Sequence, residues 1–448
     1  MFRFLFLVFV AINFDAQAAP ATNHHVIIIT IDGCAAFYFD DPKAPIPNLR
    51  KIGAQGVVAK GMKVANPSVT WPNHTTLVTG VYPAKHSLLY NGLMVPNKNG
   101  GLSREPERSK MELVAVPTVY DFLHEKGFST AAINWPATQK ATTLDFCLPD
   151  LHTPLPFTTP QLVKELIAEK ILDDSSDEAF LSVATPKREQ IWSDIACYLI
   201  RTHQPNFMLL HFLIADGMQH RYGPQSAEAY EALGLIDGHI GKLIDTLEKT
   251  SLRENTSVFI VADHGFERVK KHIVANAILR KADLLETADG KTRVQFISEG
   301  GTAMIYFRSA KTKEADRKRV ISLFKKQEGI DQIIEPKDFG KYGYPLPENN
   351  AQMADLVLAA QSGYGFSSLE MVKEFIVPTR DEGAGSHGYL STHPKMNALF
   401  IASGRGIAKG KKIGVVENID IAPTAAYLLG ENFPNTDGKL LKQILATP

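Results

Sequence analysis

The sequence predicts an α/β protein with a doubly wound, mostly parallel sheet and an inserted cap. Two observations carry this prediction. Apolar, β-branched runs alternate with helical patterns along most of the chain, and one long stretch differs in composition. Strands that alternate with helices are typical of a parallel sheet with helices on both faces. In such sheets, ligands bind beyond the carboxyl ends of the strands.

Four apolar runs indicate the strands. Continuous runs of this kind are typical of strands that are buried on both faces. Three of them stop at an acidic residue, which places Asp32, Asp216 and Asp263 where the topology predicts a site. The runs are HVIIITIDG (25–33), FMLLHFLIAD (207–216), SVFIVADHG (257–265) and NALFIASG (397–404).

Helical patterns and an inserted segment complete the predicted architecture. Residues 118–127 and 229–249 have the apolar spacing of helices. Residues 275–380 are richer in Lys, Glu and Asp and include the Pro-rich loop KYGYPLPENN, so we expect an inserted cap there. The predicted core then comprises residues 19–274 and 381–448.

The N-terminus has the pattern of a secretory signal peptide in residues 1–18. Arg3 precedes an apolar run of about 11 residues, and Ala16-Gln17-Ala18 fits the cleavage pattern. A short membrane anchor is the alternative, but the run is well under the ~20 residues that span a bilayer. We therefore expect a secreted or periplasmic protein with no membrane span after cleavage.

Charge and cysteine content narrow the class of protein. Lys plus Arg and Asp plus Glu number 48 each, so the zero net charge gives no indication of binding to a nucleic-acid scaffold. Three cysteines in 448 residues do not make a disulfide scaffold and allow one bridge at most.

Acids and histidines near the predicted strand ends have the chemistry of a metal site. Mixed carboxylate and imidazole ligands suit zinc and similar divalent ions. With the hydroxyl of Thr70 there are seven such groups, too many for one tetrahedral ion but suited to two ions ~4 Å apart, as in phosphoryl transfer. The groups are Asp32, Thr70, Asp216, His220, Asp263, His264 and His387.

Each of these residues also has an ordinary structural interpretation. An Asp-Gly after a strand is usually a turn. Asp216 and His220 fit a helix pair that faces solvent, and His387 fits a loop. Several acids that converge on one sheet edge would, however, repel each other unless a cation held them. Their convergence therefore favours a metal site.

The segment around Thr70 resembles a known family signature. TWPNHTTLVTGVYPAKH (70–86) resembles the Thr-aromatic-Pro-Asn-His motif of the type I phosphodiesterase/nucleotide pyrophosphatase branch of the alkaline phosphatase superfamily. The resemblance implies a sheet of alkaline-phosphatase type. Other motifs of the family are similar to ADGMQHRYGP (215–224), VADHG (261–265), SHGY (386–389) and NWPA (134–137), the last with Ala137 in place of Gly.

The resemblance also implies two divalent metal ions, with Zn²⁺ as the expected metal. One ion would be bound by Asp216, His220 and His387. The other would be bound by Asp32, Thr70, Asp263 and His264.

The same resemblance implies how the substrate is attacked and held. Thr70 would attack phosphorus and become a phospho-threonine, because a Thr hydroxyl is a competent nucleophile once a metal lowers its pKa. The side chain of Asn91 and the backbone N–H of Trp71, at a helix start, would hold the phosphate.

The implied activity is metal-dependent hydrolysis of phosphodiester or pyrophosphate bonds in nucleotides or related organic phosphodiesters. A phosphomonoesterase or phosphonate hydrolase on the same site is one alternative. A non-catalytic exported metal-binding protein is another, although a structural zinc site is normally closed by four protein ligands. A sulfatase is disfavoured because no Cys/Ser-x-Pro-x-Arg motif lies around Thr70.

Base recognition is where the sequence departs from the family. Nucleotide-cleaving members stack the base between the aromatic residue after the nucleophile, here Trp71, and a tyrosine that we would expect near Leu155. Phe157 is the nearest aromatic residue to that position. The nucleotide preference is therefore weaker than the phosphodiesterase prediction.

Other histidines are predicted to have no metal role. His74 is expected to make local hydrogen bonds, and His393 precedes a proline and lacks the flanking glycine of His387. The remaining ones, His86, His211 and His239, are predicted to be helix or core residues.

Overall fold

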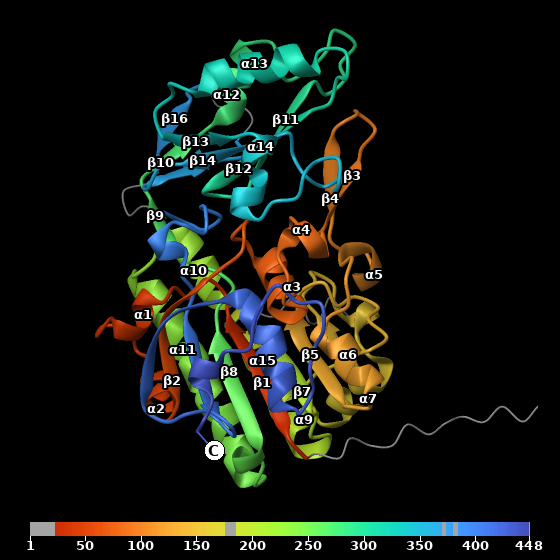
Figure 1. Cartoon of the computed structure of the whole chain (residues 1–448), viewed down its shortest axis with the longest axis vertical. Helices are drawn as coiled ribbons and strands as arrows, with labels where there is room; N and C mark the ends of the chain where they lie inside the picture. Colours follow the sequence, from red (N-terminus) through yellow and green to blue (C-terminus); the bar gives the residue numbers. More distant parts are fainter. Residues whose placement is uncertain (1–22, 175–184, 370–372, 380–383, 448) are drawn as a thin grey trace, which may run out of the picture.

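Two lobes of unequal size make up the protein (Figure 1). The computed structural model describes residues 23–174, 185–369, 373–379 and 384–447, so the predicted signal peptide at 1–18 lies outside the described residues. In these ranges no helix is both long and apolar enough to cross a bilayer. Cys34, Cys147 and Cys197 are buried and form no disulfide.

The large lobe is built on an eight-stranded sheet with the order β19-β2-β18-β8-β1-β7-β5-β6. At its centre, β1 (His25–Ile31) pairs in parallel with β7 (Phe207–Phe212) and with β8 (Thr256–Val261). The mostly parallel, doubly wound fold is thereby confirmed. The other strands are β2 (Val57–Lys63), β5 (Thr130–Trp135), β6 (Phe146–Pro149), β18 (Phe400–Gly404) and β19 (Lys411–Glu417).

One predicted strand runs against its neighbours. β18, within the run at 397–404, lies between β2 and β8 and is antiparallel to both. Its apolar residues are nevertheless buried, since helices cover the sheet at this point as well. Burial on both faces explains why the sequence pattern of β18 matches that of the parallel strands.

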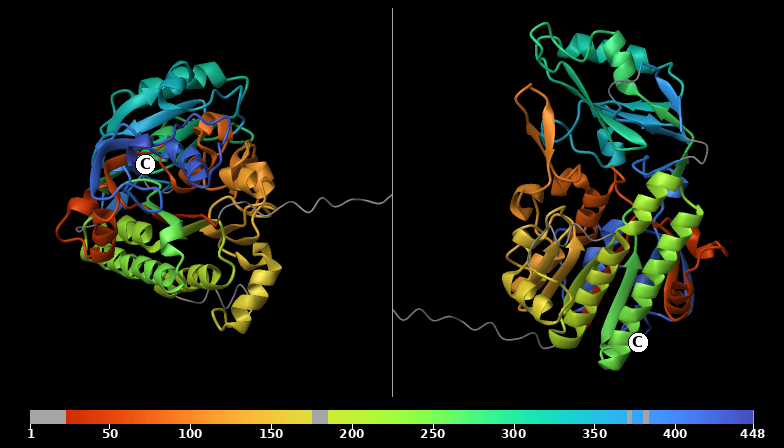
Figure 2. Two further views of the ribbon diagram at one scale, coloured as in Figure 1. Left: turned by 60° about the horizontal axis from the view of Figure 1, so that its bottom comes forward. Right: turned by 180° about the vertical axis from the view of Figure 1, so that it is seen from behind.

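Helices cover both faces of the central sheet (Figure 2). One group packs together on one face and comprises α2 (Pro47–Ala54), α9 (Thr185–Thr202), α10 (Ile214–Tyr222) and α11 (Ala227–Lys249). The other group comprises α3 (Thr70–Thr79), α6 (Val119–Glu125) and α15 (Ile421–Leu428). The helices predicted at 118–127 and 229–249 correspond to α6 and α11.

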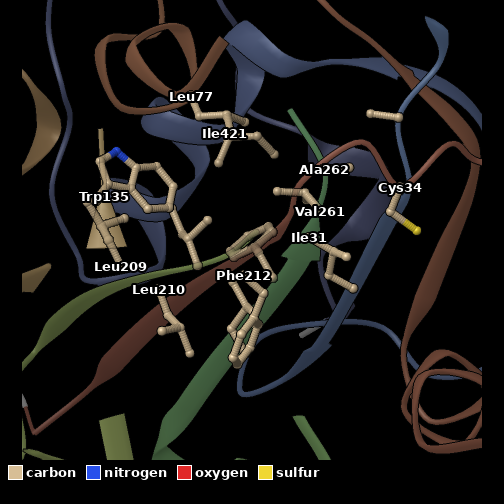
Figure 3. Packing of buried hydrophobic residues seen from close by; sticks show 14 of the residues in the cluster. Ile31, Cys34, Leu77, Trp135, Leu209, Leu210, Phe212, Val261, Ala262 and Ile421 are labelled. Carbon is tan, nitrogen blue, oxygen red and sulfur yellow. The ribbon is translucent and has the colours of Figure 1, made fainter. Parts of the chain in front are cut away.

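Apolar side chains lock α3 onto the sheet (Figure 3). Leu77 of α3 and Ile421 of α15 lie next to each other beside the strand residues Phe212 and Val261. All four side chains are completely buried. Complete burial of such a side chain stabilises the fold by roughly 1.5–3 kcal/mol, so α3 is held rigidly against the strand ends.

The small lobe is formed mostly by the segment predicted as a cap. Its main sheet is antiparallel, with the order β11-β12-β14-β13, and α12 (Ala275–Lys281) and α13 (Lys313–Phe324) flank it. The strands are β11 (Val294–Ser298), β12 (Thr302–Phe307), β13 (Ile330–Ile334) and β14 (Leu356–Ala360). The boundaries at 275 and 380 stay a prediction.

Shorter strands connect the lobes. β10 (Lys271–Ile273) pairs with β15 (Tyr364–Phe366) and β16 (Ile376–Pro378), whereas β9 (Glu267–Val269) pairs with β17 (Ala384–Ser386). A hairpin of β3 (Leu93–Pro96) and β4 (Leu102–Glu105) rises from the large lobe beside the small one (Figure 1).

Candidate metal centre and nucleophile

The carboxyl ends of β1, β7 and β8 face the small lobe, and α3 begins at the same junction (Figure 1). Asp32 directly follows β1, and Asp263 comes two residues after the end of β8. Asp216 is placed differently from the prediction, because β7 ends at Phe212 and Asp216 lies in the first turn of α10.

Glu189 explains why the apolar run at 207–216 changes from strand to helix. Its carboxylate accepts hydrogen bonds from the backbone N–H groups of Leu213, at 3.0 Å, and Ile214, at 2.7 Å. Amides at a helix start lack partners within the helix, and an acidic side chain there is stabilising. Glu189 therefore starts α10 and, with it, sets the position of Asp216.

The first cluster of candidate ligands is formed by Asp32, Asp263 and His264. Their ligand atoms all lie within 4.8 Å of one another, and all three side chains are buried. Nε2 of His264 is 3.3 Å from Oδ1 of Asp32 and 3.3 Å from Oδ2 of Asp263.

The second cluster is formed by Asp216, His220 and His387, whose ligand atoms also lie within 4.8 Å of one another. Nε2 of His220 is 3.4 Å from Oδ2 of Asp216, one helical turn away, and Nε2 of His387 is 3.7 Å from Oδ1. The rings of His387 and His264 are stacked, with centroids 3.8 Å apart, so the two clusters adjoin.

Backbone carbonyls orient all three histidines in the same way. In each histidine, Nδ1 is 3.1 Å from a carbonyl oxygen. The carbonyl belongs to Gly385 for His220, to Gly265 for His264 and to Ser68 for His387. A carbonyl only accepts, so Nδ1 carries the hydrogen and Nε2 keeps a lone pair that faces its cluster. This is the arrangement of imidazoles that bind a metal.

The carboxylates have acceptor atoms that no protein group satisfies. Both oxygens of Asp32, Oδ1 of Asp216 and Oδ2 of Asp263 are buried and have no hydrogen-bond donor among the described residues. Burial is the main cause that raises the pKa of Asp32, and the negative charge of Asp216 is the second. The pKa of Asp263 is raised mainly by burial and next by the negative charge of Asp32. A bound cation would supply the missing partner, so the donor set fits divalent metal ions.

Thr70 begins α3, and its hydroxyl faces the first cluster. Oγ1 of Thr70 is 3.5 Å from Nε2 of His264. The entry to the helix is fixed by Asn73, which is fully buried. Its Oδ1 accepts from the N–H of Ala65 at 2.9 Å, and its Nδ2 donates to the carbonyls of Pro67, at 3.0 Å, and Val69, at 2.9 Å. These bonds account for the asparagine three residues after Thr70 in the sequence.

Asn91 and Trp71 meet at the helix start. The backbone N–H of Trp71 donates to Oδ1 of Asn91 at 3.0 Å, which leaves Nδ2 of Asn91 as its donor for an anion. The indole N–H of Trp71 donates to Oδ2 of Asp150 at 2.9 Å, and only 5% of Trp71 is exposed. Neighbouring apolar side chains therefore cover most of the ring to which the resemblance assigns a stacking role.

The loop expected to carry a second aromatic residue carries aliphatic ones. Leu155 belongs to the main core of the large lobe, whereas Leu151 packs against the apolar cluster that contains Trp71. Phe157 lies under the ammonium group of Lys140, 5.8 Å from the ring centroid. None of these three residues therefore provides a second aromatic ring that could stack on a base opposite Trp71.

Histidines without a predicted metal role lie outside both clusters. His393 faces Glu267 at 3.4 Å, His86 faces the hydroxyl of Thr76 at 3.0 Å, and the ring of His239 is stacked on that of Phe212. His74 contacts the carbonyl of Thr70 at 2.8 Å, a local hydrogen bond of the kind predicted.

His211, predicted to be a helix or core residue, is buried in β7, and the sequence did not indicate its contact with Asp32. Its Nε2 is 3.4 Å from Oδ2 of Asp32, and its Nδ1 is 3.0 Å from both Oγ1 of Thr30 and Nε2 of His74. The parallel register that pairs Thr30 with His211 produces this contact. A predicted pairing of the strands at 25–33 and 207–216 would have placed His211 behind Asp32.

We expect Gly388→Ala to displace His387 from its cluster. Gly388 has φ +76°, and a Cβ there would lie 1.6 Å from the carbonyl oxygen of Glu299. The backbone must therefore move beside His387, which should lower the amount of divalent metal retained after dialysis as well as the melting temperature.

The matched control is Gly363→Ala, which has φ +82° but nothing within 4 Å of the added atom. It should cost only the ~1–2 kcal/mol of a left-handed alanine and leave the metal content unchanged. Equal metal content in the Gly388→Ala and Gly363→Ala variants would contradict this interpretation of the site.

Comparison with known proteins agrees with this architecture. The chain is 24% identical over 414 residues to human ectonucleotide pyrophosphatase/phosphodiesterase family member 1, covering 88% of this chain but 39% of that protein. It is 24% identical over 421 residues to the bovine bis(5'-adenosyl)-triphosphatase ENPP4, covering 92% of this chain and 80% of that one.

A solved structure shares the fold. Murine ectonucleotide pyrophosphatase/phosphodiesterase 5 superposes with a TM-score of 0.72 at 18% identity, and the match covers 94% of this chain and all of that one. Residues 26–390 match the family described as type I phosphodiesterase / nucleotide pyrophosphatase. The match spans most of the chain, including every candidate ligand, and the protein therefore belongs to this family.

Proposed function

We propose that the protein is a hydrolase that cleaves phosphodiester or pyrophosphate bonds of small organic substrates with the help of two divalent metal ions, most simply Zn²⁺. The observation that carries the proposal is the contact between two carboxylate–histidine clusters and a helix that begins with a hydroxyl residue. The names of two relatives, a nucleotide pyrophosphatase/phosphodiesterase and a triphosphatase, support it.

One ion is assigned to each cluster, with Thr70 added to the first. Burial raises the pKa of Asp216, but the nearby His220 and His387 lower it by more than burial raises it. The carboxylate therefore stays ionised, which suits a metal ligand. Bound divalent ions would lower the pKa of the Thr70 hydroxyl and screen the charge of the phosphate. The assigned ligands are Asp216, His220 and His387 for one ion, and Asp32, Thr70, Asp263 and His264 for the other.

Thr70 acts as the nucleophile in this proposal. Its Oγ1 loses a proton to solvent and forms a bond to phosphorus, while the bond from phosphorus to the leaving oxygen breaks on the opposite side. The products of this step are a phospho-threonine that keeps the other substituent of the phosphorus, and an alcohol or phosphate that takes up a proton from solvent. Water then attacks the phosphorus, and the Thr70 oxygen leaves and regains a proton.

The start of α3 holds the phosphate during both steps. Nδ2 of Asn91 donates to a phosphate oxygen, and the positive end of the α3 dipole adds to the attraction. The N–H of Trp71, expected as a second donor, is itself bonded to Oδ1 of Asn91. Donors that are fixed before the reaction stabilise charge that develops in the transition state. The bond between Asn91 and Trp71 fixes this donor in advance.

The charges near the site favour a diester over a monoester. A monoester dianion carries more charge on its non-bridging oxygens and calls for an extra cation. Lys85 is the one Lys or Arg after Thr70 in the segment 64–91, and it is bonded to Asp437 at the surface. Arg104 of the hairpin is bonded to Glu299 at 3.0 Å. The donors assigned to the phosphate, by contrast, are neutral.

Substrate and location complete the proposal. The second aromatic residue was expected near Leu155, and Leu155 itself is buried in the main core, so organic phosphodiesters in general are proposed as substrates rather than nucleotides in particular. The N-terminal sequence supports a secreted or periplasmic location.

Thr70→Ala is expected to abolish turnover of bis-p-nitrophenyl phosphate because the attacking oxygen is removed. The fold and the metal content should largely persist, since the ion next to residue 70 keeps its carboxylate and histidine ligands. Thr70→Ser keeps that oxygen and should keep part of the activity. Steady-state kinetics and metal analysis of both variants provide the test, and a wild-type kcat in Thr70→Ala would exclude Thr70 as the nucleophile.

Two zinc ions per chain are expected from metal analysis of the purified protein. Asp216→Ala should lose the ion held with His220 and His387, and Asp263→Ala the ion next to Thr70, so each should bind about half the metal. Absence of metal together with activity that resists chelators would refute the two-ion assignment.

Diesters are expected to exceed monoesters in kcat/KM. The measurement compares bis-p-nitrophenyl phosphate with p-nitrophenyl phosphate at the same pH and Zn²⁺ concentration. Neutral donors stabilise a singly charged diester well but leave the second charge of a monoester unmatched. A preference for the monoester would overturn the diesterase assignment and leave the metal assignment intact.

A further inference from the structure

We infer that the small lobe positions Asn91 through a strap formed by residues 87–105, and that Gln352 is the positioning residue of that lobe. The strap runs from Ser87 through Asn91 and continues into the hairpin of β3 and β4. The inference rests on the proposed function, because that function makes Asn91 the phosphate donor.

Gln352 binds the backbone of the strap with both ends of its amide. Oε1 accepts from the N–H of Met94 at 2.6 Å, and Nε2 donates to the carbonyl of Met94 at 3.1 Å. The main chain of Gln352 is held in turn, since the hydroxyl of Tyr306 donates to its carbonyl at 2.6 Å and is contacted by the hydroxyl of Tyr90. One residue of the small lobe thus fixes the strap three positions after Asn91.

Asn350 fixes the strap on the other side of Asn91. Its Nδ2 donates to the carbonyl of Ser87 at 3.1 Å, and its Oδ1 accepts from the N–H of Gln352 at 2.8 Å. Asn350 and Gln352 therefore act as one unit that holds the strap both before and after Asn91.

Apolar contacts also assign the strap to the small lobe. Leu89, Tyr90 and Met94 are buried in a hydrophobic cluster whose other members come mainly from that lobe, including Met304 and Val357. Asn91 itself is bonded to Trp71 at the start of α3. Asn91 therefore lies where the strap passes from α3, the helix that begins with Thr70, to the small lobe. A shift of the small lobe would consequently change the position of the phosphate donor.

The hairpin supplies a matched control. Gln295 binds Leu102 in the same way, with Oε1 accepting from its N–H at 2.7 Å and Nε2 donating to its carbonyl at 2.8 Å. Both glutamines come from the small lobe and each binds one strand of the hairpin. Leu102, however, follows the hairpin tip, whereas Met94 precedes it and lies close to Asn91.

The kinetic test compares Gln352→Ala, Gln295→Ala, Asn91→Ala and the Asn91→Ala/Gln352→Ala double variant on bis-p-nitrophenyl phosphate. Gln352→Ala should raise KM about tenfold, since a donor displaced by a fraction of an ångström binds the phosphate less well. Gln295→Ala should change KM less than about twofold. In the double variant, Gln352→Ala should add no loss to that of Asn91→Ala, because it acts through Asn91.

Three outcomes would overturn the inference. They are losses that multiply in the double variant, an equal rise of KM in Gln295→Ala, and a kcat/KM of Gln352→Ala equal to that of the wild type.

Amide hydrogen exchange separates this inference from the proposed function because it needs no substrate. Residues 88–95 should exchange faster in Gln352→Ala than in the wild type and Gln295→Ala. If the wild type hydrolyses no phosphodiester, the proposed function fails, and faster exchange in Gln352→Ala still supports control of this loop by the small lobe. Unchanged exchange overturns the inference whether or not the enzyme is active.

Discussion

Buried carboxylate oxygens without hydrogen-bond donors are the constraint on which the arrangement of the site depends. Asp32, Asp216 and Asp263 come from separate segments of the chain, and the parallel sheet brings them to one edge. In a medium of low dielectric constant, such groups repel each other unless cations or protons accompany them. The fold tolerates this arrangement because the surrounding apolar core is large and well packed.

The remaining polar contacts serve to hold these ligands and the hydroxyl of Thr70 in place. Backbone carbonyls fix the three imidazole rings, Glu189 starts the helix that carries Asp216, and Asn73 fixes the loop before Thr70. Each of these groups is itself tied to backbone atoms, which move little in a packed structure. The protein scaffold thus fixes the positions of the ligands, and the charge of their carboxylates is left for bound cations to balance.

Much of this arrangement could be predicted from the sequence, for two physical reasons. Continuous apolar runs identify strands buried on both faces, and the carboxyl ends of parallel strands share one edge, so Asp32 and Asp263 could be placed together. The contacts of three other residues could not be predicted in the same way, because their partners are distant in the sequence and no periodic pattern marks them. These residues are Glu189, His211 and Gln352. The burial of Trp71 depends on loops whose paths follow from tertiary packing alone.

The order in which the strands lie has a consequence for how the chain acquires its structure during synthesis. β18, at residues 400–404, lies between β2 and β8 and therefore separates the early strand β2 from β8, β1 and the rest of the sheet. His387 likewise emerges long after Asp216 and His220. A nascent chain thus exposes an unpaired edge of β8 and an incomplete ligand cluster until its last quarter is made. Because an unpaired edge can pair with another chain, aggregation is the main hazard for this protein before β18 is made.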